Sequence, residues 1–182
     1  KLAEIYQPKK ITPATVEFVD IAGLVKGAST GEGLGNQFLG HIAEVDAIAH
    51  IVRCFEDPEV VHVSGSVNPK RDIEIIETEL ALRDVNVVTT GINRLEKVAR
   101  SGDKVAAATV EVLKLLLVPL DQGRPAREVL GQMSPAQLEI VRPLNLLTAK
   151  PVLYVANVGE GDLGKEDLPA LPQGFGYLVP AD

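Results

Sequence analysis

Residues 150–157 read Lys-Pro-Val-Leu-Tyr-Val-Ala-Asn, and residues 47–52 read Ala-Ile-Ala-His-Ile-Val. Both runs are almost continuously apolar, which is typical of strands that are covered on both faces in a parallel sheet. A third run, Ala-Thr-Val-Glu-Phe-Val-Asp at residues 14–20, is β-branched and ends in a carboxylate just before Ala22 and Gly23, so we expect a buried strand that runs into a turn. Polar groups at the ends of three such strands predict an open α/β sheet with a site along its carboxyl edge.

The chain between the second and third of these strands follows a helical pattern. Apolar residues recur at three- and four-residue spacing over 73–99 and again over 105–120, so we expect a coiled-coil-like hairpin of two helices. Ser101-Gly102-Asp103 supplies its turn, and Pro119 is expected to disturb the second helix. Ser134, Pro135 and Gln137 predict a capping box that starts a short third helix. The first helix also has an acid-rich face that we expect to be solvated: Glu74, Glu77 and Glu79.

The composition excludes several classes of protein. Of the 182 residues, 46% are apolar but only 4% are aromatic, so the core is aliphatic and few rings are present to stack on single-stranded nucleic acid. The net charge of −7 disfavours bulk nucleic-acid binding, and we expect no sequence-specific DNA binding. The lone Cys54 excludes an internal disulfide and fits a reducing cytosol, and His41, His50 and His62 lack the spacing of a zinc site. No apolar segment reaches the roughly 18 to 20 residues of a membrane span, so we expect a cytoplasmic protein with no membrane partner.

Asp20 and Gly23 form the Asp-x-x-Gly pattern that P-loop nucleotide hydrolases place after a buried strand. In that chemistry the carboxylate reaches Mg²⁺, usually through water, and the glycine amide binds the terminal phosphate. A pattern with two fixed positions also arises by chance. In that case Asp20 only caps the turn that follows it.

The segment from Gly23 to Gly40 holds too many glycines for a packed element and suits a mobile loop. Gly31, Gly33 and Gly35 superficially suggest a dinucleotide-binding loop, but they begin many residues after the strand rather than in its first turn. We therefore interpret them as part of a switch segment that bound nucleotide orders. Helical spacing returns after this segment, at Phe38, Ile42 and Val45.

Several longer stretches carry a resemblance: GLVKGAS at 23–29, GEGLGNQFL at 31–39, RCFE at 53–56, VHVSG at 61–65, DIE at 72–74 with TEL at 78–80, LLTAKP at 146–151 and YVANV at 154–158. With these stretches the chain closely resembles the YchF/Obg-like ATPase family of the Obg-related P-loop proteins. The resemblance runs from Lys1 to about Glu160. It implies an α/β P-loop NTPase of the Ras-like G-domain type, with an incomplete parallel sheet and an inserted coiled-coil-like helical hairpin.

The resemblance also implies ATP hydrolysis by in-line attack of water, assisted by Mg²⁺. Asp20 would hold the metal through water, and Gly23 would touch the γ-phosphate. Leu24 stands where Ras-like enzymes have the glutamine that orients water, and His62 is the implied replacement, although a histidine beside valines is often only a packing residue. The implied switch residues are Leu24, Lys26, Gly27, Gly31, Gly33 and Gly35.

Asn157, Val158 and Glu160 occupy the position of the base-reading motif of GTPases. Val158 and Glu160 replace the lysine and aspartate that clamp guanine, and the longer glutamate moves its carboxylate away from the guanine-matching position. The resemblance therefore implies that these three residues read adenine. It also implies association with the ribosome and a role in translation or stress regulation. The alternatives are a GTPase of the Obg family, or a noncatalytic module that docks a partner through the hairpin.

We expect three regions: part of the G domain at 1–67, the helical insertion at 68–146, and the return to the G domain at 147–182. No usable Gly-x-x-x-x-Gly-Lys-Ser/Thr motif is present, because Glu166 replaces the Ser or Thr of the one Gly-x-x-x-x-Gly-Lys match, at 159–165. The chain also begins at Lys1 without an initiator Met. We therefore expect a central fragment without the Walker A loop and the C-terminal TGS domain, which alone binds and hydrolyses ATP poorly.

Overall fold

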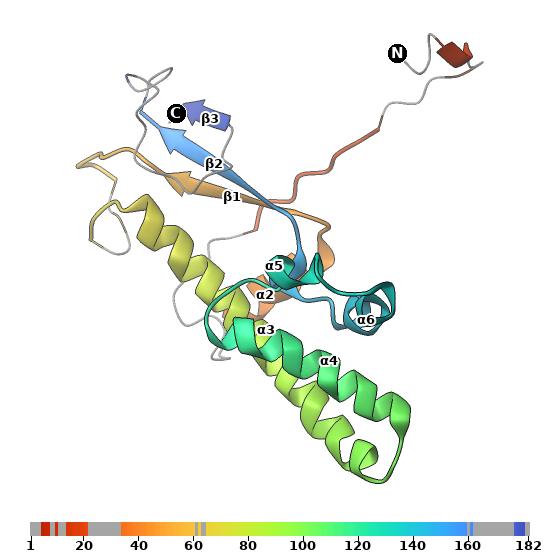
Figure 1. The fold of residues 1–182 in the computed structure, drawn as a ribbon. Helices are drawn as coiled ribbons and strands as arrows, with labels where there is room; N and C mark the ends of the chain where they lie inside the picture. Colours follow the sequence, from red (N-terminus) through yellow and green to blue (C-terminus); the bar gives the residue numbers. More distant parts are fainter. Residues whose placement is uncertain are drawn as a thin grey trace.

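The computed structural model describes residues 5–7, 10, 14–21, 34–60, 62, 65–159, 161 and 177–180. Its strands lie side by side, and a long helical hairpin extends away from them (Figure 1). The elements are α2 (Leu34–Glu44), β1 (Ile48–Arg53), α3 (Pro69–Arg100), α4 (Lys104–Asp121), α5 (Arg127–Leu130), α6 (Pro135–Val141), β2 (Val152–Val158) and β3 (Tyr177–Pro180), with short 3₁₀ turns at Arg142–Leu144 and Leu147–Ala149.

The strands β1, β2 and β3 form a parallel sheet in that order. Ile48 pairs with Val152 at one end of the β1–β2 ladder, and Arg53 pairs with Asn157 at the other. The strand predictions at 47–52 and 150–157 are therefore confirmed. Because the two strands pair in parallel, their carboxyl ends meet at one edge of the sheet.

The strand predicted at 14–20 is wrong. Residues 14–21 have no strand pairing with any other described segment, and Val16 and Phe18 are 78% and 81% exposed. Figure 1 shows this part of the chain as an extended segment leading toward the sheet. A strand needs the main-chain hydrogen bonds of a neighbour, and β-branched residues alone do not supply them. Only Ile21, at the end of the segment, packs against a buried apolar cluster.

The glycine-rich segment ends earlier than predicted, because α2 begins at Leu34. Gly35 and Gly40 therefore belong to a helix rather than to a loop. Each glycine inside a helix costs about 1 kcal/mol relative to alanine. Burial of Leu39 and Ile42 against Leu80 and Leu147 offsets this cost, as the helical spacing of the apolar residues led us to expect.

The predicted hairpin is formed by α3 and α4, which pack against each other along their length. The side chain of Asn68 accepts a hydrogen bond from the Arg71 amide and caps α3. Gly102 adopts φ +99° in the turn, a backbone conformation that favours glycine. Asp103 then caps α4 by accepting from the amides of Val105 and Ala106 at 2.9 Å each. Helix-capping chemistry thus explains where both helices begin.

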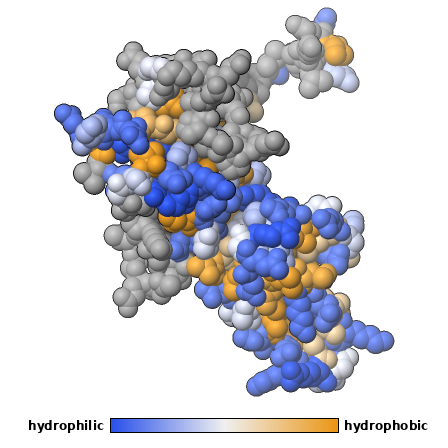
Figure 2. All heavy atoms as spheres, turned by 60° about the vertical axis from the view of Figure 1, so that its left-hand side comes forward, coloured by the Kyte–Doolittle hydropathy of each residue, from blue (hydrophilic) through white to orange (hydrophobic). Residues whose placement is uncertain are grey.

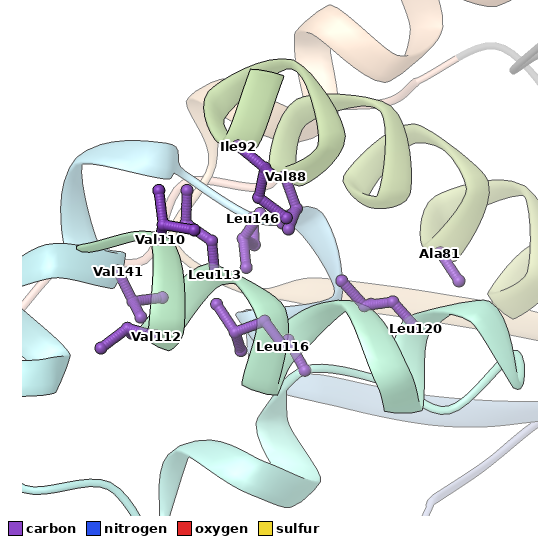
Figure 3. Packing of buried hydrophobic residues seen from close by; sticks show 11 residues of the cluster. Ala81, Val88, Ile92, Val110, Val112, Leu113, Leu116, Leu120, Val141 and Leu146 are labelled. Carbon is purple, nitrogen blue, oxygen red and sulfur yellow. The ribbon is translucent and has the colours of Figure 1, made fainter. Parts of the chain in front are cut away.

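The core of the hairpin is aliphatic, as predicted. Val88 and Leu116 are fully buried, and a side chain at Gly91 would meet Leu113 at 3.1 Å, so a glycine allows α4 to approach α3 closely. Figure 3 shows these side chains pointing into the space between the helices. The buried members are Ala81, Val88, Ile92, Val110, Val112, Leu113, Leu116, Leu120, Ala126, Val141 and Leu146.

Pro119 is tolerated where it was expected to disturb α4. It lies buried in the last turn, and the helix ends two residues later at Asp121. The predicted α6 is confirmed together with its capping box, in which Ser134 and Gln137 exchange side-chain and main-chain hydrogen bonds. No helix among the described residues is both long and apolar enough to cross a membrane.

The acid-rich face predicted on the first helix is only partly solvated. Glu74 is exposed, whereas Glu79 is 5% exposed and Glu77 is half-buried beside Arg127. The reason is that α3 turns these two acids toward its neighbours, where partners compensate their charge. The surface of the hairpin mixes charged and apolar patches (Figure 2), and its exposed apolar side chains include Leu115 and Val118.

Asp84 ties the hairpin to the segment that leads into β2. Its carboxylate is fully buried and accepts hydrogen bonds from the amides of Leu147 and Thr148 at 2.9 and 2.8 Å, and from the Thr148 hydroxyl at 2.7 Å. Arg83 donates to the same carboxylate at 3.0 Å. A buried charge with this many donors fixes the position at which the chain re-enters the sheet.

Candidate functional site at the carboxyl edge of the sheet

The carboxyl ends of β1 and β2 are held together beyond their ladder. The Cys54 amide, just after β1, donates a hydrogen bond of 2.7 Å to the carbonyl of Asn157. Burial raises the pKa of the Cys54 thiol, which disfavours a reactive thiolate here. The segment that leaves β1 thus starts beside Asn157, so the sequence-based placement of this residue at the sheet edge holds.

The side chain of Asn157 contains an unpaired acceptor. Its Oδ1 atom is buried and has no hydrogen-bond partner among the described residues. The next residue, Val158, is fully buried. Glu160, the third residue of the predicted base-reading motif, lies outside the described residues. A buried acceptor without a donor is rare in proteins and marks a place where a bound group can donate.

Arg53 organises the loop that follows β1, a role for which the sequence offered no signal. Its guanidinium donates to the carbonyls of Phe55, Val60 and Asp57 at 3.0, 2.9 and 3.4 Å. The same group lies over the ring of Phe55, 4.6 Å from the centroid. One side chain at the end of β1 therefore fixes most of the loop on the path to His62.

His62 lies between this loop and the first turn of α3. Its Nε2 is 3.0 Å from Oδ2 of Asp72, and the two side chains are 17% and 20% exposed. The His62 carbonyl also accepts a hydrogen bond from the Gly65 amide. The histidine is therefore held beside a helix N-terminus and still reaches solvent. Sequence reasoning selected His62 but assigned no role to Asp72, which lies one turn after the Asn68-Pro69 helix start.

The structure does not bring Asp20 to this edge. Asp20 is exposed, and the neighbouring Ile21 packs against the cluster that also contacts Ile48, at the start of β1. Asn157 pairs with Arg53, which lies five residues after Ile48 on β1. At the usual rise of a strand, the two ends of β1 are about 16 Å apart. Gly35 lies in the first turn of α2. The other predicted switch residues lie outside the described residues: Gly23, Leu24, Lys26, Gly27, Gly31 and Gly33.

A polar cluster joins one face of the sheet to the hairpin. Tyr154 of β2 donates to Glu77 of α3, and Arg127 lies 2.5 Å from the same carboxylate. Burial, together with Glu77, raises the pKa of Tyr154 to about 12. The ring of His50 lies 5.6 Å from Tyr154, and burial lowers its pKa against the opposing charges of Glu77 and Asp72. The cavity here is only about 10 Å³, space for one water, so the cluster is structural.

A wider groove of about 490 Å³ lies on the hairpin side. Its apolar floor includes Leu115, Val118 and Val129, and its rim carries the ion pair between Arg124 and Glu128. Among the described residues, no group of three or more His, Cys, Asp or Glu side chains is arranged to hold a metal ion.

Comparison with known proteins shows the family to which the chain belongs. The family described as "50S ribosome-binding GTPase" matches residues 3–90. "Ribosome-binding ATPase YchF" of Escherichia coli O157:H7 is 50% identical over 173 residues, which cover 95% of this chain and 47% of that protein. The protein of the same name from Bacillus subtilis strain 168 is 50% identical over 163 residues, covering 90% of this chain and 44% of that protein. The chain thus spans about half the length of the curated relatives it matches.

The solved "Structure of the Schizosaccharomyces pombe YchF GTPase" superposes with a TM-score of 0.69 at 42% identity, covering 88% of this chain and 44% of that one. Together with the parallel sheet, this defines the fold as that of a GTPase-type P-loop NTPase, as the sequence predicted. Within that class, the chain belongs to the YchF/Obg-like family.

Proposed function

We propose that this chain carries the base-recognition edge and the water-handling histidine of an ATP-hydrolysing protein. The observation that carries the proposal is Asn157, whose buried Oδ1 has no donor at the carboxyl end of β2. Leaving such an acceptor unpaired costs roughly 1–3 kcal/mol. The exocyclic amine of adenine can donate to it, whereas guanine has a carbonyl at the same ring position. The names of the bacterial relatives, which call them ATPases, also support ATP.

In this proposal the residues of the sheet edge divide the work. Asn157, the main chain of Val158 and the carboxylate of Glu160 contact the base. His62, on the segment that leaves β1, accepts a hydrogen bond or proton from the attacking water. Leu24 cannot bind that water, because its side chain has no polar atom.

Two further parts of the proposed site are Gly23, which touches the γ-phosphate, and the metal. Asp20 offers one exposed carboxylate, the kind of oxygen ligand that Mg²⁺ takes, although the structure does not place it at the edge that holds Asn157. In the proposal it would contact the metal through water. When bound, the metal neutralises phosphate charge. The switch role of Lys26, Gly27, Gly31, Gly33 and Gly35 belongs to the same proposal.

The proposed regional boundaries are 1–67, 68–146 and 147–182. They are supported by the start of α3 at Pro69 and by the return toward β2 after the 3₁₀ turn at Leu147–Ala149. Ribosome binding and a cytoplasmic location are proposed from the printed names of the relatives.

Nucleotide choice is tested with the protein expressed from its complete reading frame. ATP and GTP compete for one fluorescent nucleotide analogue, and we expect ATP to displace it at lower concentration. Asn157→Ala should weaken ATP more than GTP, because it removes the acceptor for the adenine amine. Cys54→Ala is the control, because Cys54 lies beside Asn157 and its main-chain hydrogen bond to the Asn157 carbonyl survives the substitution. GTP is the competing nucleotide, since the solved yeast structure is named a GTPase. A clear preference for GTP would overturn the assignment of Asn157 and Glu160.

The role of His62 is tested by steady-state hydrolysis in the same protein. We expect His62→Ala to lower kcat by about 100-fold, the lower range for a lost general base. His41→Ala is the matched control, because His41 is exposed on α2. Unchanged turnover in His62→Ala would remove the histidine from the mechanism.

The second candidate function is a noncatalytic docking module, which the groove along α4 favours. Co-sedimentation with ribosomes distinguishes it. If Leu115→Asp and Val118→Asp abolish co-sedimentation while the wild-type protein hydrolyses no ATP, the docking module is the better description. Normal hydrolysis by the wild-type protein supports the enzyme.

A further inference from the structure

We propose that Asp72 is a positioning residue for His62, because its Oδ2 fixes the orientation and tautomer of the imidazole. The importance of this for hydrolysis rests on the proposed function. The pairing itself rests on geometry alone.

The first observation is the contact between the two side chains. His62 Nε2 lies 3.0 Å from Asp72 Oδ2, a buried oxygen that accepts no hydrogen bond from any other described residue. Both side chains are mostly buried, so little water reaches the carboxylate. The two atoms are at hydrogen-bond distance, and the imidazole is the group placed to pair with this oxygen.

The second observation is that the Asp72 carboxylate is also held by a second side chain, that of Arg71. Arg71 donates to Asp72 Oδ1 through Nε and Nη2 at 3.2 and 3.1 Å. The same guanidinium donates to the Ser66 hydroxyl at 3.1 Å and to the Ser66 carbonyl. Asp72 also lies in the first turn of α3, behind the Asn68 cap. Oδ1 is therefore occupied, and Oδ2 is held in place toward His62.

The chemical consequence follows from the two nitrogens of a neutral imidazole. One carries the proton and the other the lone pair, and a carboxylate beside Nε2 favours the tautomer with the proton on Nε2. Nδ1 is then the nitrogen that accepts a hydrogen bond or proton from water. If the ring becomes protonated, the carboxylate also stabilises the positive charge. Asp72 acts through His62 and touches neither nucleotide nor water.

The tautomer is measured on this 182-residue chain by ¹⁵N NMR with labelled histidine, at a pH where the rings are neutral. We expect His62 to be protonated on Nε2 and Asp72→Asn to shift it toward a mixture of both tautomers. Glu74→Gln is the matched control, because it removes the same charge from an exposed position on the same helix. A His62 tautomer that is the same in wild type and Asp72→Asn, or a wild-type ring protonated on Nδ1, would overturn the proposal.

The kinetic test uses the protein expressed from its complete reading frame. We expect Asp72→Asn to lower kcat by about tenfold at unchanged KM, since only the water-handling group is disturbed. Combining it with His62→Ala should cause no loss beyond His62→Ala alone, and Asp72→Glu should restore part of the rate. An additive double variant would contradict the proposal. If His62→Ala has no effect on turnover, the proposed function fails while the NMR result still decides the pairing.

Discussion

The helical hairpin and the carboxyl edge of the sheet are built on opposite principles. In the hairpin, Val88 and Leu116 are fully buried between α3 and α4. At the sheet, Ile51 of β1 is 66% exposed and Leu153 of β2 is 43% exposed, so one face of these strands is not covered by the described residues. Among the residues that the structure describes, the buried side-chain atoms without a hydrogen bond are Asn157 Oδ1, at the sheet edge, and Asp72 Oδ2, in the first turn of α3. The hairpin is stabilised by its own two halves, whereas the edge contains acceptors that the described residues leave unpaired.

The largest expected effect comes from separating these two regions at Asp84. Asp84→Ala leaves the buried amides of Leu147 and Thr148 without an acceptor, so we expect a loss of about 4 kcal/mol in the free energy of unfolding. Urea denaturation followed by circular dichroism measures it. Glu111→Ala, at an exposed site on α4, is the control and should change stability by less than about 0.5 kcal/mol. A loss below about 1 kcal/mol would mean that Asp84 does not connect the two regions.

The next effect tests whether the hairpin core is as tight as its burial indicates. Leu116→Ala removes a fully buried side chain, and we expect a loss of about 3 kcal/mol in the free energy of unfolding. The neighbouring Leu115 is 54% exposed, so Leu115→Ala should cost less than about 0.5 kcal/mol. The same denaturation assay compares the two variants. Equal losses would show that the apolar groove beside Leu115 is covered in solution.

The same contrast explains what the sequence could predict. The hairpin was predictable because its information is local: apolar spacing, the Ser101–Asp103 turn and the capping box at Ser134 each act within a few residues. Glu77 was misassigned because its partner Arg127 lies fifty residues further along the chain, and Glu79 because its burial depends on how α3 packs. The failed strand at 14–20 has the same cause, since β-branched residues indicate a strand but only a neighbour pairs with it.

Some residues of the candidate site could be predicted from the sequence, and others depend on contacts between distant parts of the chain. Asn157 was found because a polar residue at the end of a buried run has a known place at a sheet edge. His62 entered through the resemblance to a family. Arg53 and Asp72 lie in stretches that belong to the resemblance, but their roles could not be assigned, because these depend on the path of the loop that joins β1 to α3. Gly35 was assigned to a loop from composition, although packing of Leu39 and Ile42 extends the helix through it.

A smaller effect tests how the hairpin begins its second helix. Asp103→Ala removes the acceptor for two amides at the start of α4, so we expect a loss of about 1 kcal/mol in the free energy of unfolding. Asp121→Ala is a control of opposite sign. It removes a negative charge from the last turn of the same helix, where the helix dipole disfavours it. We therefore expect the free energy of unfolding to stay unchanged or to rise by about 0.3 kcal/mol. Equal losses in both variants would contradict the capping role.

The smallest effect lies where the two regions meet, at Tyr154. Burial and Glu77 raise its pKa from 10.0 to about 12 in the folded chain. Because the folded pKa is above the unfolded one, the protonated phenol contributes stability that is complete below pH 10 and is lost as the pH rises from 10 toward about 12. Urea denaturation between pH 9 and pH 11.5 should therefore show a decline that Tyr154→Phe lacks, and the difference between the two proteins separates this group from titrating lysines. Parallel pH profiles would mean that the phenol hydrogen bond to Glu77 does not help hold the sheet to α3.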